Sequence, residues 1–168
     1  MKILVDADSC PKQARELVSR FSARLGIKAI FAANRPIPGI DTGSVATATA
    51  VMEICPPGDG SADNRIVELA QTGDLVLTRD LPLAERLVEA GVTALDDRGR
   101  VFTKENIRSL RSLRDFAVGL AENGLGIERI PSYGRRELNA LANSLDRELT
   151  RLFKHLPENE KRVPKPNL

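Results

Sequence analysis

Four aspartates stand at positions where an α/β protein could carry out hydrolysis: Asp6, Asp8, Asp63 and Asp80. Asp6 and Asp8 come directly after the apolar residues 3–5, and Asp80 follows a second apolar run at 75–77. Side chains two residues apart in an extended chain point to the same side, so Asp6 and Asp8 are expected to form a pair. Parallel sheets bind ligands beyond the carboxyl ends of their strands, which is where these acids are expected to lie.

Asp63 is expected to join the other acids from a helix. It lies three residues before Ile66 and seven before Ala70, so helical spacing turns it toward the body of the protein. A lone buried carboxylate is costly unless it is paired or bound to a metal. Asp59, just upstream, either adds to the cluster or is an ordinary turn residue.

Metal-dependent hydrolysis of phosphodiesters is the chemistry that such a set of acids favours. Clustered carboxylates repel one another unless a cation holds them, and oxygen ligands suit Mg²⁺ or Mn²⁺. A bound metal of this kind activates water and stabilises charge on the phosphate oxygens. His155 is the only histidine, which argues against zinc hydrolases and Ser-His-Asp hydrolases. The four acids are therefore candidate catalytic residues and candidate ligands of Mg²⁺ or Mn²⁺.

Each acid also has a purely structural alternative. Asp8 and Asp80 each precede an expected helix, so either carboxylate could cap it. Asp63 falls in a first helical turn, where the helix dipole favours an acid. Asp96 and Asp97 are typical of a turn.

Hydrophobic spacing predicts strands and helices in alternation, and hence a parallel sheet. Strands are expected over residues 2–6, 27–33, 46–55, 74–78 and 92–95, with helices over 11–25, 62–71 and 82–90. Two longer helices are expected over 103–123 and 134–156. The predicted fold class is α/β, a mostly parallel sheet flanked by helices, with a helical C-terminal extension packed on the same body. Residues 1–156 are expected to form one domain, and 157–168 a flexible tail.

Charge is distributed unevenly along the chain. Residues 1–100 carry 12 Lys/Arg and 14 Asp/Glu, whereas residues 101–168 carry 13 and 9. Basic side chains on one side of each long helix could follow the phosphates of a nucleic acid. The candidate nucleic-acid-binding residues are Arg108, Arg111, Arg136, Arg147 and Arg151. The alternative is the solvated face of an amphipathic helix, and aromatic residues make up only 4% of the chain, which gives base stacking little support.

The remaining features favour a cytoplasmic protein. No apolar run approaches the roughly 20 residues that span a bilayer, and no signal-peptide pattern is present. Cys10 and Cys55 are too few for a disulfide framework, so free thiols are expected. Cys10 has no nearby histidine to activate it, which favours a small buried residue. Tyr133 either stacks on a base or packs against the protein.

Several stretches together resemble one bacterial family. They are Val5-Asp6-Ala7-Asp8-Ser9-Cys10-Pro11, Ala33-Asn34-Arg35, Asp59-Gly60-Ser61-Ala62-Asp63 and Gly73-Asp74-Leu75-Val76-Leu77-Thr78-Arg79-Asp80-Leu81-Pro82-Leu83-Ala84. From residue 1 to about residue 150 the sequence resembles the uncharacterised YaiI/YqxD family, which is grouped with PIN-like nuclease domains. That grouping implies a Rossmann-like parallel sheet whose acids bind Mg²⁺ or Mn²⁺ for RNA cleavage.

Asp6-Ala7-Asp8 also resembles the opening of haloacid-dehalogenase phosphatases, in which the first Asp is a nucleophile and the second a general acid. That fold requires a Ser or Thr at the end of the next strand, where this chain has Ala32-Ala33-Asn34, so the match is poor.

The sequence thus predicts a divalent-metal-dependent nuclease, with RNA the more expected substrate. Asp6 and Asp80 would be the primary metal ligands, and Asp8 and Asp63 would complete the site. Neighbouring polar residues are expected to bind phosphate or to orient the ligands: Ser9, Asn34, Thr78 and Arg79. The alternative is a non-catalytic module that retains an acidic metal pocket and binds nucleic acid or protein. The oligomeric state stays open.

Overall fold

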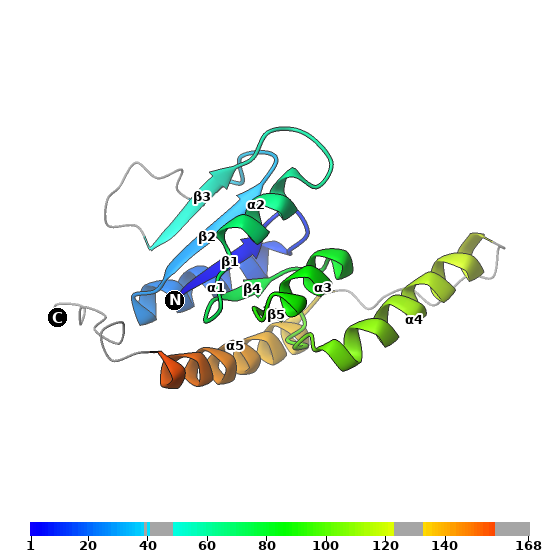
Figure 1. The fold of residues 1–168 in the computed structure, drawn as a ribbon. Coiled ribbons are helices and arrows are strands. Elements are labelled where there is room, and N and C mark those ends of the chain that lie inside the picture. The colour runs from blue at the N-terminus through cyan, green and yellow to red at the C-terminus, as the bar shows by residue number, and fades with distance from the viewer. Residues whose placement is uncertain (39, 41–48, 123–132, 157–168) are drawn as a thin grey trace.

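A five-stranded sheet, parallel throughout, forms the centre of the protein (Figure 1). The computed structural model describes residues 1–38, 40, 49–122 and 133–156. The strands are β1 (Lys2–Asp6), β2 (Lys28–Ala33), β3 (Ala50–Ile54), β4 (Leu75–Leu77) and β5 (Thr93–Leu95), in the order β3-β2-β1-β4-β5. This is the strand order of a Rossmann-like doubly wound sheet, so the predicted α/β class is confirmed.

Helices cover both faces of this sheet, which explains why its strands are continuous apolar runs. On one face, α1 (Lys12–Leu25) and α5 (Arg135–His155) pack on the sheet. On the other face, α2 (Ser61–Leu69) and α3 (Leu81–Glu89) do so. Each central strand therefore buries alternate side chains in two different cores. In β1, Ile3 and Val5 enter the α1/α5 core and Leu4 enters the α2/α3 core.

The first helix of the C-terminal extension, α4 (Lys104–Glu122), packs against the body only at its beginning. Ile107 is buried, whereas the side chains of Leu113 and Phe116 are 64% and 66% exposed. Figure 1 shows why: α4 leaves the body beside α3 and runs outward beyond the end of the sheet. The prediction that both long helices pack on the body is right for α5 and wrong for most of α4. A stripe of apolar residues predicts an amphipathic helix, but it does not show whether another part of the protein packs against that stripe.

The strand boundaries agree closely with those expected, and the third strand is the least complete. The sequence predicts it from residue 46, whereas β3 begins at Ala50 and residues 46–48 lie outside the described part of the chain. The predicted flexible tail, 157–168, also lies outside it. Within the described residues, no helix is both long and apolar enough to cross a membrane.

The opposite ends of the central strands are fastened in different ways. At the amino end, the buried carboxylate of Asp74 accepts hydrogen bonds from the backbone N–H of Lys2 at 2.8 Å and from its Nζ at 2.6 Å. The backbone N–H of Gln71 also donates to it, at 3.0 Å. These contacts fix β1 against β4, so an acid at this end is structural. The acids at the carboxyl end have other surroundings.

The loop after β5 is held against α5 through Gly99. Its carbonyl accepts a hydrogen bond of 2.6 Å from the Ser144 hydroxyl, and its φ of 82° is a left-handed conformation that favours glycine. A Cβ at this position would lie 2.5 Å from the backbone oxygen of Ala140, which no rotamer change can relieve.

We expect Gly99→Ala to destabilise the protein more than Gly73→Ala does. Both glycines have positive φ, at 82° and 96°, but a Cβ at Gly73 would meet nothing within 4 Å. Gly73→Ala should therefore cost only the backbone strain, about 1–2 kcal/mol. Gly99→Ala adds a backbone clash to that strain. Urea denaturation of both variants measures the difference, and equal losses of stability would show that α5 does not press on this loop.

Candidate functional site

The chain reverses its direction of travel across the sheet between β1 and β4. From β1 it proceeds outward to β2 and β3, and it then returns to β4 on the other side of β1 and continues to β5. At such a topological switch point the connections leave on opposite faces and open a crevice beyond the carboxyl ends of the strands. Asp6 ends β1, and Thr78 directly follows β4, so the two residues flank this crevice.

Asp6 is held firmly although it is almost fully buried, with 5% of its surface exposed. Its Oδ2 accepts a hydrogen bond of 2.6 Å from the Ser9 hydroxyl and one of 2.8 Å from the Thr78 hydroxyl. Hydrogen bonds to a carboxylate fix its orientation. Ser9 and Thr78 therefore position the Asp6 side chain.

The same two hydroxyls also hold the turn after β4. The Thr78 hydroxyl accepts a hydrogen bond of 3.0 Å from the backbone N–H of Asp80, and the Ser9 hydroxyl accepts one of 3.3 Å from that of Arg79. Each hydroxyl thus donates to Asp6 and accepts from the Arg79-Asp80 turn. The ends of two strands are joined in this way, through residues 72 positions apart in the sequence.

Asp80 caps α3: its Oδ1 accepts a hydrogen bond of 2.8 Å from the backbone N–H of Leu83. The structural alternative for this residue is therefore confirmed. Capping uses one carboxylate oxygen, and a carboxylate has lone pairs on both. Asp80 also lies close enough to Asp63 to influence its ionisation.

Asp63 lies in the first turn of α2, and its carboxyl pKa is raised above the ordinary value. Partial burial is the largest cause, followed by the negative charges of Asp6 and Asp80, while the positive charge of Arg86 opposes them. Asp6 and Asp80, on other elements, thus lie near enough to Asp63 to affect its ionisation. Asp63 is half-buried, and the alternative that it is a first-turn residue holds.

Asp8 lies at the rim of the crevice, on the side of β2. Its Oδ2 accepts a hydrogen bond of 2.8 Å from the backbone N–H of Asn34, and its Oδ1 is 3.8 Å from the Nε of Arg35. It does not cap α1, because the residue at that cap is Pro11 and no side chain bonds there. The capping alternative for Asp8 is therefore wrong.

Asn34 connects β2 with the start of α2. Its Nδ2 donates to the carbonyl of Gly58 at 3.4 Å, and its Oδ1 accepts from the hydroxyl of Ser61 at 2.7 Å. Ser61 is the first residue of α2, so these bonds place the first turn of that helix, and with it Asp63, near the crevice.

Asp97 is a further acid at this edge that the sequence does not single out. It follows β5, its side chain is 3% exposed, and its Oδ1 lies 3.4 Å from the Nε of Arg79. Its Oδ2 is buried and has no hydrogen-bond partner within the described residues. Burial raises the pKa of this carboxyl, and the charge of Arg79 opposes the rise. Both acids lie in the turn after β5, as predicted. Asp96 stabilises it, since its side chain accepts from the backbone N–H groups of Arg98 and Arg100.

Two other candidates have structural roles. Cys10 is buried, and burial together with the charges of Asp6 and Asp97 raises the pKa of its thiol. The thiol form is thus stabilised, which agrees with a small buried residue rather than a nucleophile. Tyr133 packs against the α1/α5 core and donates a hydrogen bond of 2.8 Å to the carbonyl of Asp97, which agrees with the packing alternative.

The predicted nucleic-acid-binding residues lie on α4 and α5, and several have acidic neighbours. Arg147 and Arg151 contact the two oxygens of the buried Glu148, at 3.1 and 2.8 Å. Arg111 pairs with Glu85 of α3. Arg108 and Arg136 are exposed. Three of the five cations are therefore already paired with carboxylates.

The carboxylate and hydroxyl oxygens at this edge are the ligand types that a hard divalent cation prefers. The carboxylates are not spaced closely enough to surround such a cation with protein ligands alone. Among the described residues, no three His, Cys, Asp or Glu side chains form a group that could hold a metal ion. Mg²⁺ usually keeps several waters and binds through one or two carboxylates, so a water-rich site does not need three direct ligands. The repulsion that raises the pKa of Asp63 is the kind that a cation would relieve.

The fold defines a class: a Rossmann-like α/β protein with Asp6 at the switch point of its parallel sheet. The family model described as "Uncharacterized BCR, YaiI/YqxD family" matches residues 4–151, and the chain belongs to this family. No solved structure matches it.

Relatives in other bacteria cover nearly the whole chain. The UPF0178 protein of Treponema pallidum (strain Nichols) is 45% identical over 154 residues, which are 92% of this chain and 84% of that protein. The UPF0178 protein of Treponema denticola is 41% identical over 92% of this chain and 95% of its own. That of Syntrophobacter fumaroxidans is also 41% identical, over 92% of this chain and 97% of its own.

We expect Asp63→Asn to stabilise the metal-free protein at neutral pH. The pKa of Asp63 is raised in the folded state, so the native protein bears the cost of ionising it whenever the pH exceeds that pKa. Below the unfolded value of 3.8 both states hold the proton and the cost disappears. The advantage of the variant should therefore shrink as the pH falls toward 3.8.

Urea denaturation of parent and variant in EDTA across this pH range measures the effect. Asp59→Asn is the control, because Asp59 is exposed just before the same helix. An advantage that does not change with pH, or one that the control shares, would contradict the electrostatic account of Asp63.

Proposed function

We propose that this protein is a divalent-metal-dependent nuclease that hydrolyses phosphodiester bonds at the carboxyl edge of its sheet. The observation that supports the proposal is the buried Asp6 carboxylate at the end of β1, held by Ser9 and Thr78, whose charge, with that of Asp80, helps to raise the pKa of Asp63. Its position at the switch point of a Rossmann-like sheet supports a ligand site there. RNA is the expected substrate because the family resembles PIN-like nuclease domains.

The residues have distinct roles in this proposal. Asp6 and Asp80 would hold Mg²⁺ or Mn²⁺, with Asp63 completing the site and Asp8 orienting water at its rim. A bound metal of this kind supplies an activated water and neutralises charge on the phosphate oxygens. The hydroxyls of Ser9 and Thr78 keep the Asp6 carboxylate oriented.

Arg79 would act on the phosphate side of the same reaction. Its backbone is fixed through Ser9, and Asp97 holds its guanidinium through Nε at 3.4 Å. The guanidinium has five N–H donors, so one such contact leaves others for a phosphate oxygen. Asp97 would therefore position Arg79.

A second function has its own support, a non-catalytic module that binds nucleic acid or protein. Asp6, Asp8 and Asp80 each accept a hydrogen bond from the protein, and no three acidic, His or Cys side chains in the described part of the chain are grouped for a metal. Carboxylates held in this way could be purely structural. The two functions differ in whether a substrate is cut.

We expect the purified protein with Mn²⁺ to cleave labelled single-stranded RNA, and Asp6→Asn to reduce the rate roughly a hundredfold or more. Asn preserves the shape of Asp6 and removes its charge, so the site should lose its cation but keep its fold. Asp115→Asn, an exposed change on α4, is the matched control and should cleave as the parent does. Chelation with EDTA should abolish cleavage by the parent.

Cleavage that persists equally in Asp6→Asn and in the parent would refute the nuclease proposal, because the activity could not then depend on this site. RNA binding without cleavage in any divalent metal would favour the non-catalytic module.

A further inference from the structure

Two adjoining cavities run along α1 toward the acidic edge. The larger, of about 610 Å³, lies between α1 and the segment after β2, and it is lined by Lys12, Arg15, Glu16, Ser19, Arg20, Pro38 and Ile40. The smaller, of about 250 Å³, is lined by Ala7, Asp8, Arg15, Arg35, Pro36, Ile37 and Pro38. They share Arg15 and Pro38, so together they form one groove, here called the α1 groove.

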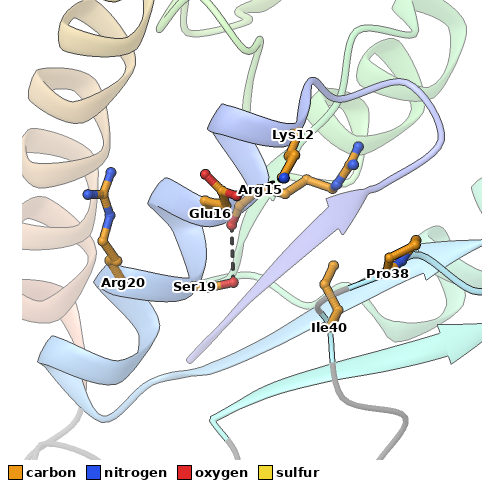
Figure 2. Close-up of a pocket in the computed structure, with 7 residues that line it drawn as sticks. All are labelled: Lys12, Arg15, Glu16, Ser19, Arg20, Pro38 and Ile40. Carbon is orange, nitrogen blue, oxygen red and sulfur yellow. Dashed lines mark hydrogen bonds and ion pairs between the residues drawn. The ribbon is translucent and has the colours of Figure 1, made fainter.

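The α1 groove is cationic on its walls. Its lining includes four cations, Lys12, Arg15 and Arg20 of α1 and Arg35 after β2, and the carboxylates of Glu16 and Asp8. Figure 2 shows Lys12 and Arg15 on the side of α1 that faces Pro38 and Ile40. The groove is therefore suited to an anion.

Its cations are only loosely neutralised. Lys12 is 3.7 Å from Glu16 and 77% exposed, and Arg35 is 3.8 Å from Asp8 and 81% exposed. Exposed pairs at such distances contribute little free energy, so a phosphate can replace the partner at small cost. Arg15 instead donates to the backbone carbonyls of Ala7 and Cys10, which fixes its side chain and leaves its charge in place.

Three of the candidate cations of α4 and α5 differ in this respect. Arg147 and Arg151 contact the buried Glu148 at 3.1 and 2.8 Å, and Arg111 pairs with Glu85. A phosphate at these positions would have to separate closer pairs, and separating those of Glu148 would leave a buried carboxylate unpartnered. The α1 groove is the better binding surface on that comparison.

The dimensions of the groove suit a polynucleotide strand. Lys12 and Arg20 are separated by eight residues of α1, or about 12 Å along the helix axis. Successive phosphates are spaced by about 3.4 Å along the axis of a stacked strand and by more in an unstacked one, so this length accommodates at most about three or four nucleotides. The groove then continues past Arg35 to Asp8, two residues after Asp6.

We propose that the α1 groove binds the phosphate backbone of a single-stranded nucleic acid and leads it to Asp8 at the acidic edge. The wall opposite α1 is apolar, with Pro36, Ile37, Pro38 and Ile40, and can contact the faces of unstacked bases, which a duplex keeps inside. Contacts to phosphates and to base faces do not read base edges, so we expect the binding to tolerate any base sequence. Cleavage of the bound strand rests on the proposed nuclease function, whereas binding in the groove can be measured without cleavage.

The test is fluorescence anisotropy with a short labelled single-stranded RNA of mixed sequence, in EDTA and over a series of NaCl concentrations. The groove variant is Lys12→Ala with Arg35→Ala, which removes one exposed cation from each wall. The matched control is Lys28→Ala with Arg114→Ala, which removes the same charge from exposed positions on β2 and α4. Thermal melting should show that both variants fold as the parent does.

We expect the groove variant to bind roughly tenfold more weakly at low salt, and the magnitude of its log–log salt slope to fall by about 0.7 for each phosphate that the protein no longer neutralises. The control variant should bind as the parent does, and duplex RNA should bind more weakly than the single strand. The groove proposal is overturned if the parent does not bind, if the two variants have equally reduced affinity, or if the duplex binds as tightly.

These outcomes are separate from those of the nuclease proposal. Reduced binding by the groove variant in a protein that never cleaves RNA would leave the α1 groove in place and refute the nuclease. Metal-dependent cleavage of RNA, together with unchanged RNA binding by the groove variant, would support the nuclease and refute the α1 groove as the binding surface.

Discussion

The hydroxyl of Thr78 joins the two central strands at the point where both end, and the organisation of the acidic edge depends on it. It donates to Asp6 at the end of β1 and accepts from the backbone N–H of Asp80, which begins α3. The Ser9 hydroxyl makes the equivalent pair of bonds with Asp6 and Arg79. Because burying a polar group is costly unless it is hydrogen-bonded, these bonds allow the Asp6 carboxylate to be buried at the sheet edge.

Electrostatic repulsion is the cost of this arrangement. The charges of Asp6 and Asp80 help to raise the pKa of Asp63, and the nearby Arg86 offsets only part of the effect. Asp97 adds a buried carboxylate that Arg79 partly neutralises. A protein that needed only a stable sheet edge would be better served by apolar residues, or by an acid with a cationic partner, such as Asp74 has in Lys2 at the opposite edge. The α1 groove places loosely paired cations beside this acidic edge. In the proposed function the cations would contact a polyanion and the acids would contact a metal cation.

Much of the fold follows from local sequence signals, because apolar runs and helix ends are encoded within a few residues. Gly26 in a left-handed conformation ends α1, and Asp80 starts α3. Exposure on α4 could not be predicted, since Leu113 and Phe116 have the spacing of core residues and differ only in that the described part of the chain does not cover them. The burial of Asp97 could not be predicted, because Asp96 beside it has the same residue type and both lie in a turn. The two residues differ only in their tertiary contacts, since Arg79 pairs with the Asp97 carboxylate and Tyr133 donates to the Asp97 carbonyl. The groove combines residues from α1 with residues after β2, which no periodicity in the sequence connects.

The central claim is that the acids at the carboxyl edge bind a divalent cation, and paramagnetic broadening by Mn²⁺ tests it most directly. Substoichiometric Mn²⁺ added to isotopically labelled protein broadens the amide signals of residues near the bound ion, with Mg²⁺ as the diamagnetic competitor. The account predicts that residues 7–9, Asp63 and Asp80 broaden first, that excess Mg²⁺ restores their signals, and that Asp6→Asn abolishes the effect. Broadening that begins instead at exposed acids such as Glu16 and Asp115, or that is unchanged in Asp6→Asn, would contradict it.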